Sequence, residues 1–461
     1  MPCRQRPAGG FVAVVTKQIE AGRALTDIYP ARFCTLCRKE DAMSKQRIQL
    51  SDHFTYSRLL RFVLPCIGTM LFTSIYGIVD GLCVSNFVGK TAFAAVNLIM
   101  PLPMLLGTIG FMLGTGGSAI VGITLGEGDK ARADRYFSLF MSTALIAGIV
   151  LSVLGMLLLR PVALMLGAEG EMLDYALRYG RVLMLSLPTF ILQNMFQSFF
   201  VTAEKPHLGF YFTVGAGCTN MVLDVLMVGI WGWGVEGAAL ATLISQLVGG
   251  VLPVFYFIDH GNTSRLHLCR TQFYGRVLWD ACINGSSELM TNLSMSLVNI
   301  LYNYQLLRFA GEDGVAAYGV IMYASFLFVA VFVGYAVGSA PIVSYHYGAN
   351  NRKEVNNLYR KSLKLIGVVA VVMTIGSMFI IPHVARFFVG YDENLLILTT
   401  RAFRLYGLSF LIMGFNVYAS SFFTALGDGV TSALISFLRT LLFQLAALLL
   451  LPALWGIDGV W

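Results

Sequence analysis

Long apolar runs, broken by glycine, proline and charged residues, follow one another along almost the whole chain. A helix that crosses a membrane needs about 20 predominantly apolar residues, because each residue adds about 1.5 Å across a hydrocarbon core of about 30 Å. The runs predict membrane-spanning helices over residues 56–84, 91–120, 134–159, 174–201, 208–230, 236–258, 275–308, 314–343, 357–381, 396–425 and 430–453.

The pattern of runs occurs twice. The stretch GKTAFAAVNLIM, which begins at Gly89, returns in altered form as GEDGVAAYGVIM from Gly311, about 222 residues later. Thr202 and Ala203 return at the same distance as Thr424 and Ala425. Each copy has room for six spans, and because six is even, both copies enter the membrane in the same sense. We therefore predict an all-α polytopic membrane protein with two six-helix lobes that arose from an internal repeat.

The repeat also predicts how the chain is divided. We expect a polar N-terminal extension over residues 1–54, a first lobe over 55–259, a cytoplasmic linker over 260–274 and a second lobe over 275–461. Met43 opens a polar and basic lead into the first span, so we interpret it as the start, with residues 1–42 a disordered extension or a wrongly assigned start codon.

The end of the chain also departs from the repeat. Its last residues, Gly-Ile-Asp-Gly-Val from Gly456, resemble the opening of the sixth span in the first copy, Gly-Val-Glu-Gly-Ala from Gly234. We therefore expect the twelfth helix to be truncated.

Composition narrows the class of protein. Hydrophobic residues make up 57% of the chain and charged residues 12%, about half the charge of a soluble domain. The net charge is +7, but lysine and arginine lie mainly in short loops, where they orient a membrane protein, so we expect no nucleic-acid binding. Their distribution places the N-terminus and the linker in the cytoplasm. The eight cysteines form no disulfide framework, and Cys34 and Cys37 lack the second pair that a zinc site needs.

Polar side chains within the spans of the first lobe are the leading candidates for function. An ionisable group at the centre of a span costs about 3 kcal/mol, so it needs a partner or a water-filled cavity. Asp80 follows Tyr76 by four residues, which places both on one helix face. Asp224 follows Asn220 in the same way. Two neutral side chains that can complete the cluster are Gln197 and Thr242.

If these faces converge, they form an oxygen-rich pocket that binds sodium, at Asp80 and Asp224, or a pair of carboxylates that exchanges protons. Two carboxylates close together in a low dielectric do not both stay ionised, so one of them can carry a proton. The alternative is that the two aspartates only hydrogen-bond backbone groups at helix kinks. We expect no other metal site.

A second polar face lies in the seventh predicted span. Glu288 is followed at helical spacings by Asn292, Asn299 and Asn303. These side chains line a cavity, or they join helices by hydrogen bonds within the membrane. Arg439, in the eleventh span, is expected to reach the cytoplasmic water and act as an anchor.

The chain resembles the multidrug and toxic compound extrusion (MATE) family over essentially residues 55–461. The resemblance is carried by the order, spacing and duplication of short motifs. These are Leu64-Pro65, Tyr76-Gly-Ile-Val-Asp80, Ala94-Ala95, Ala316-Ala317, Asn220-Met-Val-Leu-Asp224 and Val235-Glu-Gly-Ala-Ala-Leu-Ala-Thr242.

The resemblance implies twelve helices in two lobes around a V-shaped cavity. It implies efflux of lipophilic organic cations, driven by inward movement of protons or sodium, with no cofactor beyond that coupling ion. By motif position, the six first-lobe candidates are similar to the family's cation site, namely Tyr76, Asp80, Gln197, Asn220, Asp224 and Thr242. Glu288 is similar to an acidic residue that one branch uses in its second lobe. That branch has a further acid in the tenth helix, which the stretch around Asn416 lacks.

We therefore expect a monomeric, multi-pass transporter of a bacterial-type inner membrane, whose partners are the lipid bilayer and small organic cations. One alternative is a lipid-linked oligosaccharide flippase of the same broader superfamily, which needs several arginines or lysines in its cavity to bind diphosphate. An enzyme is disfavoured, because the six histidines show no metal-binding or nucleophile spacing.

Overall fold

The computed structural model describes residues 48–88, 90–259, 261–390 and 392–461. At residues 78, 80–87, 90, 93, 312 and 387 it describes the backbone alone. Met43 and the rest of the predicted extension up to residue 47 lie outside the described residues. The described chain folds into helices joined by short turns, as the apolar runs predict.

The helices before the linker are α3 (Tyr56–Phe87), α4 (Lys90–Ile99), α5 (Pro101–Gly126), α6 (Lys130–Met165), α7 (Gly170–Thr202), α8 (Pro206–Asp224), the π-helix η1 (Val225–Ile230), α9 (Gly234–Gly250) and α10 (Leu252–Ile258). The helices after it are α11 (Gly275–Gly348), α12 (Arg352–Val389), α13 (Glu393–Gly407), α14 (Phe410–Ala425), α15 (Gly429–Phe437), the π-helix η2 (Leu438–Phe443), α16 (Gln444–Trp455) and the 3₁₀-helix η3 (Gly456–Gly459).

Nine helices in the described part of the chain are long and apolar enough to cross a membrane. A tenth span arises if α13 and α14, which are bent by 46° at their junction, are taken together. The predicted span over 275–308 is helical but is not among these helices, because its polar residues lower its mean hydropathy. The long helix α11 breaks at Gly311, whose φ of 62° and ψ of −147° suit glycine. This break separates the two predicted spans on either side of it.

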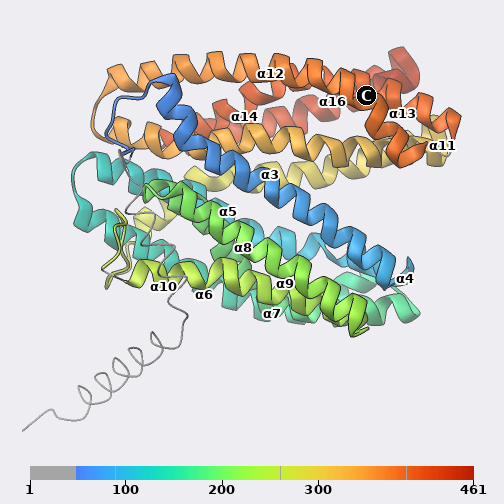
Figure 1. Ribbon diagram of the computed structural model, residues 1–461, viewed down its shortest axis with the longest axis horizontal. Helices are drawn as coiled ribbons and strands as arrows, with labels where there is room; N and C mark the ends of the chain where they lie inside the picture. The colour runs from blue at the N-terminus through green and yellow to red at the C-terminus, as the bar shows by residue number, and fades with distance from the viewer. Residues whose placement is uncertain (1–47, 89, 260, 391) are drawn as a thin grey trace, which may run out of the picture. The chain divides into compact units, whose positions relative to one another are not determined.

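The two copies of the repeat form two groups of helices. In Figure 1, α5 to α10 lie in the lower part of the view, most of the later helices lie in the upper part, and α3 runs diagonally between them. Accordingly, α3 packs against α8 of the first group and against α11 of the second. The core of the first group is aromatic, with Phe196 stacked on Phe257 at 5.6 Å between ring centres.

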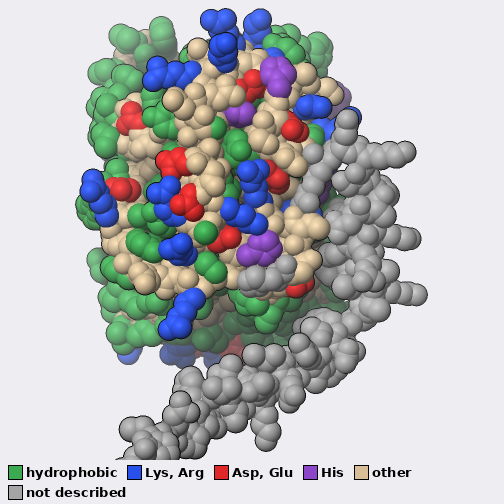
Figure 2. Space-filling view, turned by 90° about the vertical axis from the view of Figure 1, so that its left-hand side faces the viewer, with side chains coloured by type: hydrophobic (Ala, Val, Ile, Leu, Met, Phe, Trp, Pro, Cys, Tyr) green, Lys and Arg blue, Asp and Glu red, His purple; other side chains and the backbone are tan. Residues whose placement is uncertain are grey.

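Charged side chains gather at the end of the bundle where α3 begins. Figure 2 looks onto this end and shows lysine and arginine interspersed with acidic groups over its surface. The turns 127–129 and 349–351 and the connection 261–274 belong to it. We call this end the basic face.

The two lobes meet closely near the basic face, where α5 and α11 pack through glycines. A Cβ atom added at Gly126 would lie 2.0 Å from the carbonyl oxygen of Tyr345. A Cβ atom added at Gly348 would lie 2.0 Å from the carbonyl oxygen of Ile123. Gly126 and Gly348 are counterparts in the repeat, and so are Ile123 and Tyr345. The contact is therefore reciprocal, and the axis that relates the two copies passes through it.

We predict that Gly348→Ala destabilises the protein, because a methyl group at this position overlaps the backbone of α5. Overpacking of this kind costs about 1–3 kcal/mol. Thermal unfolding of the purified protein in detergent should show a lower Tm for Gly348→Ala and, because the contact is reciprocal, for Gly126→Ala. Gly215→Ala is the matched control, since a Cβ at Gly215 meets nothing within 4 Å. Equal Tm values for all three variants would contradict the close approach of α5 and α11.

Candidate functional site

Helix α8 buries its two polar candidates. Asn220 is 2% exposed and Asp224 is fully buried. The Oδ1 atom of Asn220 has no hydrogen-bond partner among the described residues. Asp224 ends α8, and the chain continues directly into the π-helix η1. Single turns of π-helix are rare and frequently occur at functional sites.

Helix α9 brings Thr242 level with this pair. The chain turns back after η1, and the N–H of Trp233 donates to the carbonyl oxygen of Met227 at 2.9 Å. A Cβ at Gly237 would lie 3.2 Å from the Met227 side chain, so α9 runs antiparallel to α8 from this point. Thr242 lies five residues beyond Gly237 along α9, and Asp224 lies three residues before Met227. The Thr242 hydroxyl donates to the carbonyl oxygen of Ala238 at 3.0 Å, which leaves its oxygen able to accept.

Helix α3 packs against α8 and runs parallel to it. Gly68 faces the ring of Phe210, and Gly217 faces the rings of Phe72 and Tyr76. This register places the Tyr76 side chain next to α8, less than one turn before Asn220. It also brings the backbone at residue 80 level with the last turn of α8. The side chain of Asp80, a predicted site residue, lies outside the described residues.

The structure places Gln197 apart from these residues. Gln197 lines a cavity of about 10 Å³, with room for one water molecule, together with Thr69, Pro206 and Gly209. Gly209 lies fifteen residues before Asp224 in α8, which is about 22 Å at 1.5 Å per residue. The Gln197 amide therefore does not complete the cluster around Asp224. Tyr76, Asn220 and Asp224 lie on the facing sides of α3 and α8, and Thr242 lies at the same level on α9.

Sequence reasoning missed a carboxamide on α7. Asn194 is 4% exposed, and its Nδ2 atom has no hydrogen-bond partner among the described residues. It lies three residues before Gln197, on a helix that contacts both α8 and α9. The signal was present in the sequence, because Gln193, Asn194, Gln197 and Ser198 are polar residues within about one turn of an otherwise apolar helix.

Two of the polar side chains predicted to form the second polar face make hydrogen bonds within α11 itself. Asn292 Nδ2 donates to the carbonyl oxygen of Glu288 at 2.9 Å. Asn299 Oδ1 accepts from the hydroxyl of Tyr318 at 2.7 Å, across the break at Gly311. Asn299 therefore joins the two halves of α11, which is one of the two roles that the sequence left open. Asn303 is half-buried on the same helix.

Glu288 has a cationic neighbour, Arg439, which we predicted from the sequence to be an anchor. Arg439 lies on η2, and the charges of Glu288 and Arg439 interact electrostatically. The Arg439 Nη1 atom is buried, and Nε donates to the hydroxyl of Thr440 at 3.2 Å. Arg439 as a whole is half-buried, so its role as an anchor stays a prediction. Within the membrane, an opposite charge nearby reduces the cost of each group.

The chain thus consists of two copies of one helical unit, with buried polar groups in each, which is the architecture of a secondary transporter. The MatE family model matches residues 65–226 and 289–448, once in each copy. The chain therefore belongs to this family and is a MATE family efflux transporter. The resemblance seen in the sequence is confirmed, as is the all-α membrane fold with two lobes.

Similar proteins cover nearly the whole chain. The multidrug export protein MepA of Staphylococcus aureus (strain MSSA476) is 23% identical over 418 residues, which are 88% of this chain and 89% of that protein. MepA of Staphylococcus haemolyticus is 21% identical over 416 residues, which are 90% of this chain and 91% of that protein. A crystal structure of MATE in complex with MaL6 shares the fold with a TM-score of 0.82 and 24% identity, over 87% of this chain and 90% of that one.

We predict that Arg439→Met lowers stability and that Glu288→Gln restores it. Removing the cation leaves a carboxylate in the membrane without its countercharge, at a cost of about 3–5 kcal/mol. Replacing the carboxylate as well removes that cost. The Tm values of the two single variants and the double variant form a double-mutant cycle. Additive effects would show that the two charges do not act as a pair.

Proposed function

We propose that the protein is a secondary active antiporter that exports lipophilic organic cations in exchange for protons or sodium. The relatives named multidrug export protein support the export of several drugs, and the fold supports alternating access. The single observation that carries the proposal is the full burial of Asp224 beside Asn220, on the side of α8 that faces α3 and α9.

A carboxylate at this position favours binding of a small cation. Burial in a membrane makes a negative charge costly, and a proton or a sodium ion cancels that charge. The oxygens of Asn220, Thr242 and Tyr76, on the same facing sides, are suited to such an ion. Because α3 contacts α11 of the second lobe as well as α8, binding at Asp224 can shift the balance between two arrangements of the lobes.

We infer that the basic face is cytoplasmic and that the protein works as a monomer in a bacterial-type inner membrane. The positive-inside rule supports the orientation, with Lys130 and Arg352 at the starts of α6 and α12. The glycine contacts of α5 and α11 lie near the same face. The structure then represents the state that is closed to the cytoplasm.

The flippase alternative calls for several arginines or lysines without a countercharge in the lobes. Arg439 is a buried cation of this kind by position, but Glu288 balances it. This pairing favours the antiporter over a carrier of diphosphate headgroups.

We predict that Asp224→Asn abolishes gradient-driven transport while leaving the protein folded. The measurement is accumulation of a fluorescent organic cation by inverted membrane vesicles under an imposed pH or sodium gradient. The gradient that drives accumulation in the unsubstituted protein identifies the coupling ion. Asp174→Asn is the matched control, because Asp174 is exposed and pairs with Arg178 one turn away at 2.7 Å. Such surface pairs contribute little, about 0–1 kcal/mol.

Two outcomes would contradict the proposal of a cation antiporter coupled through Asp224. Full transport by Asp224→Asn would remove Asp224 from the coupling mechanism. Failure to transport any organic cation, in protein shown by its Tm to be folded, would favour a lipid-linked substrate.

A further inference from the structure

A short segment at the basic face runs from one lobe to the other. Residues 50–54, which we call the strap, lead into α3, and Leu50 and Phe54 at its two ends are fully buried. The strap is held at each end by a buried carboxylate, Glu204 from the first lobe and Glu354 from the second. Neither carboxylate belongs to the candidate cation site.

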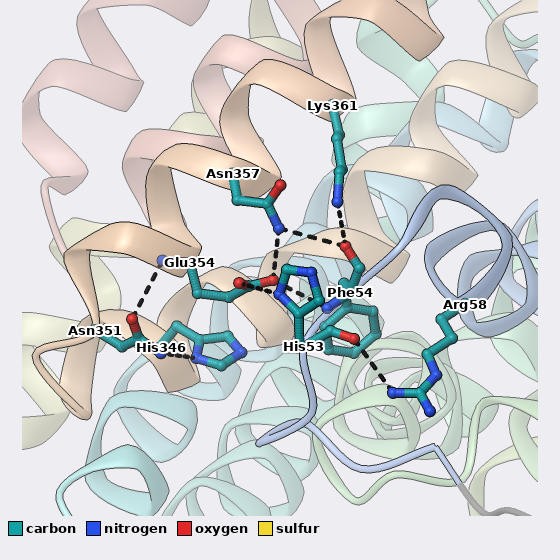
Figure 3. A network of polar contacts seen from close by, with 8 residues as sticks. All are labelled: His53, Phe54, Arg58, His346, Asn351, Glu354, Asn357 and Lys361. Atoms are coloured by element: carbon teal, nitrogen blue, oxygen red, sulfur yellow. Dashed lines mark hydrogen bonds and ion pairs between the residues drawn. The ribbon is translucent and has the colours of Figure 1, made fainter.

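Glu354, in the first turn of α12, holds the end of the strap. Its carboxylate accepts from the backbone N–H of Phe54 at 3.0 Å and from Asn357 Nδ2 at 2.8 Å, and it pairs with His53 Nδ1 at 2.7 Å. Lys361 Nζ donates to the carbonyl oxygen of Phe54 at 2.7 Å. Figure 3 shows these side chains converging on the strap from α12. The Glu354 side chain is only 8% exposed, so its charge depends on these partners.

Glu204, in the turn between α7 and α8, holds the beginning of the strap. Its Oε1 atom accepts from the backbone N–H of Leu50 at 2.9 Å and from the guanidinium of Arg265. Arg265 in turn lies over the ring of Tyr345 of α11, 4.9 Å from its centre. Half-burial alone would lower the pKa of Arg265, but the Glu204 carboxylate and the Tyr345 hydroxyl raise it, so the guanidinium stays charged. Glu204 thus reaches the second lobe by two routes.

The backbone of Glu204 adopts a conformation that favours glycine. Its φ is +61°, whereas the equivalent turn of the second lobe, after Thr424 and Ala425, has Gly427 with a φ of +80°. The left-handed conformation costs a residue with a Cβ about 1–2 kcal/mol. A strained residue persists where its surroundings hold it, and such residues cluster at functional positions. The contacts of the Glu204 carboxylate are what offset this cost.

We propose that Glu204 and Glu354 form a latch, which closes the strap across the two lobes and stabilises the state closed at the basic face. Opening of that face separates α12 from α3 and must break the bonds of Glu354 to His53 and Phe54. Glu354 is therefore a positioning residue of the transport cycle, distinct from the cation site. The inference rests on the proposed function only for the assignment of the basic face to the cytoplasmic gate.

The test is hydrogen exchange of backbone amides, measured by mass spectrometry on the full-length protein in lipid nanodiscs. Glu354→Gln keeps the shape of the side chain but removes its charge and its ion pair with His53. We expect at least a threefold faster exchange in peptides covering residues 50–58. If the latch holds the lobes, exchange also accelerates at residues 116–126 and 341–348, where α5 and α11 meet. The matched control is Glu127→Gln, which breaks an exposed ion pair with Arg132, of 2.7 Å, on the same face but within one lobe.

A second variant keeps the test decisive if Glu354→Gln does not fold. Glu204→Gly removes the carboxylate at the other end of the strap and at the same time relieves its backbone strain. We expect faster exchange of the strap and of the α5–α11 contact in this variant as well.

Faster exchange of residues 50–58 alone would show that the strap is only a local anchor, and it would overturn the latch. Unchanged exchange of the strap in both variants would overturn it too. The readout needs no substrate, so it separates the two proposals: loss of coupling through Asp224 is tested by transport, and the latch by exchange.

Discussion

The close approach of α5 and α11 at the basic face determines how the rest of the molecule is arranged. Two helices come this near to each other only where side chains are absent, and Gly126 and Gly348 supply such positions on opposite partners. Because Gly126 and Gly348 are repeat counterparts, as are the residues they face, one sequence feature duplicated once produces both halves of the contact. The strap, the Arg265 bridge and the first turn of α12 are then within reach of one another.

The duplication preserved the backbone of the lobes but not their charges. Asp224 ends α8 in the first lobe, and the residue 222 positions later is Ala446. Conversely, Arg439 of the second lobe corresponds to Gly217, which packs against Tyr76 in the first. The π-helices differ as well, since η1 follows Asp224 whereas η2 contains Arg439. The first lobe therefore has a fully buried acid at the end of α8, and the second has an acid with Arg439 as its countercharge. This asymmetry is consistent with the proposal that the coupling ion binds in the first lobe.

The sequence predicted those features that depend on one helix at a time. Apolar length located the spans, and glycine marked the break at Gly311. Helical spacing correctly placed Asn220 and Asp224 on one buried face. Spacing does not say how far along a neighbouring helix a residue lies. For that reason Gln197 was assigned to the cluster, although it lines a cavity beside Gly209, which is about 22 Å along α8 from Asp224. The countercharge of Glu288 was missed for the same reason, because Arg439 is remote in sequence and meets Glu288 only through packing.

Helix α3 connects the candidate ion site to the latch. Its first turn follows the strap, its later turns carry Tyr76 against α8, and it contacts α11 between them. A charge that moves across 100 mV supplies about 2.3 kcal/mol. A hydrogen bond to a charged group contributes about 1.5–3 kcal/mol after exchange with water is taken into account. One coupling ion therefore supplies energy of the same order as the loss of a charged bond at Glu354. The proposed latch, if of this strength, would keep the basic face closed at rest and would yield to binding of the proposed coupling ion, whereas a tighter one would hold the transporter in a single state.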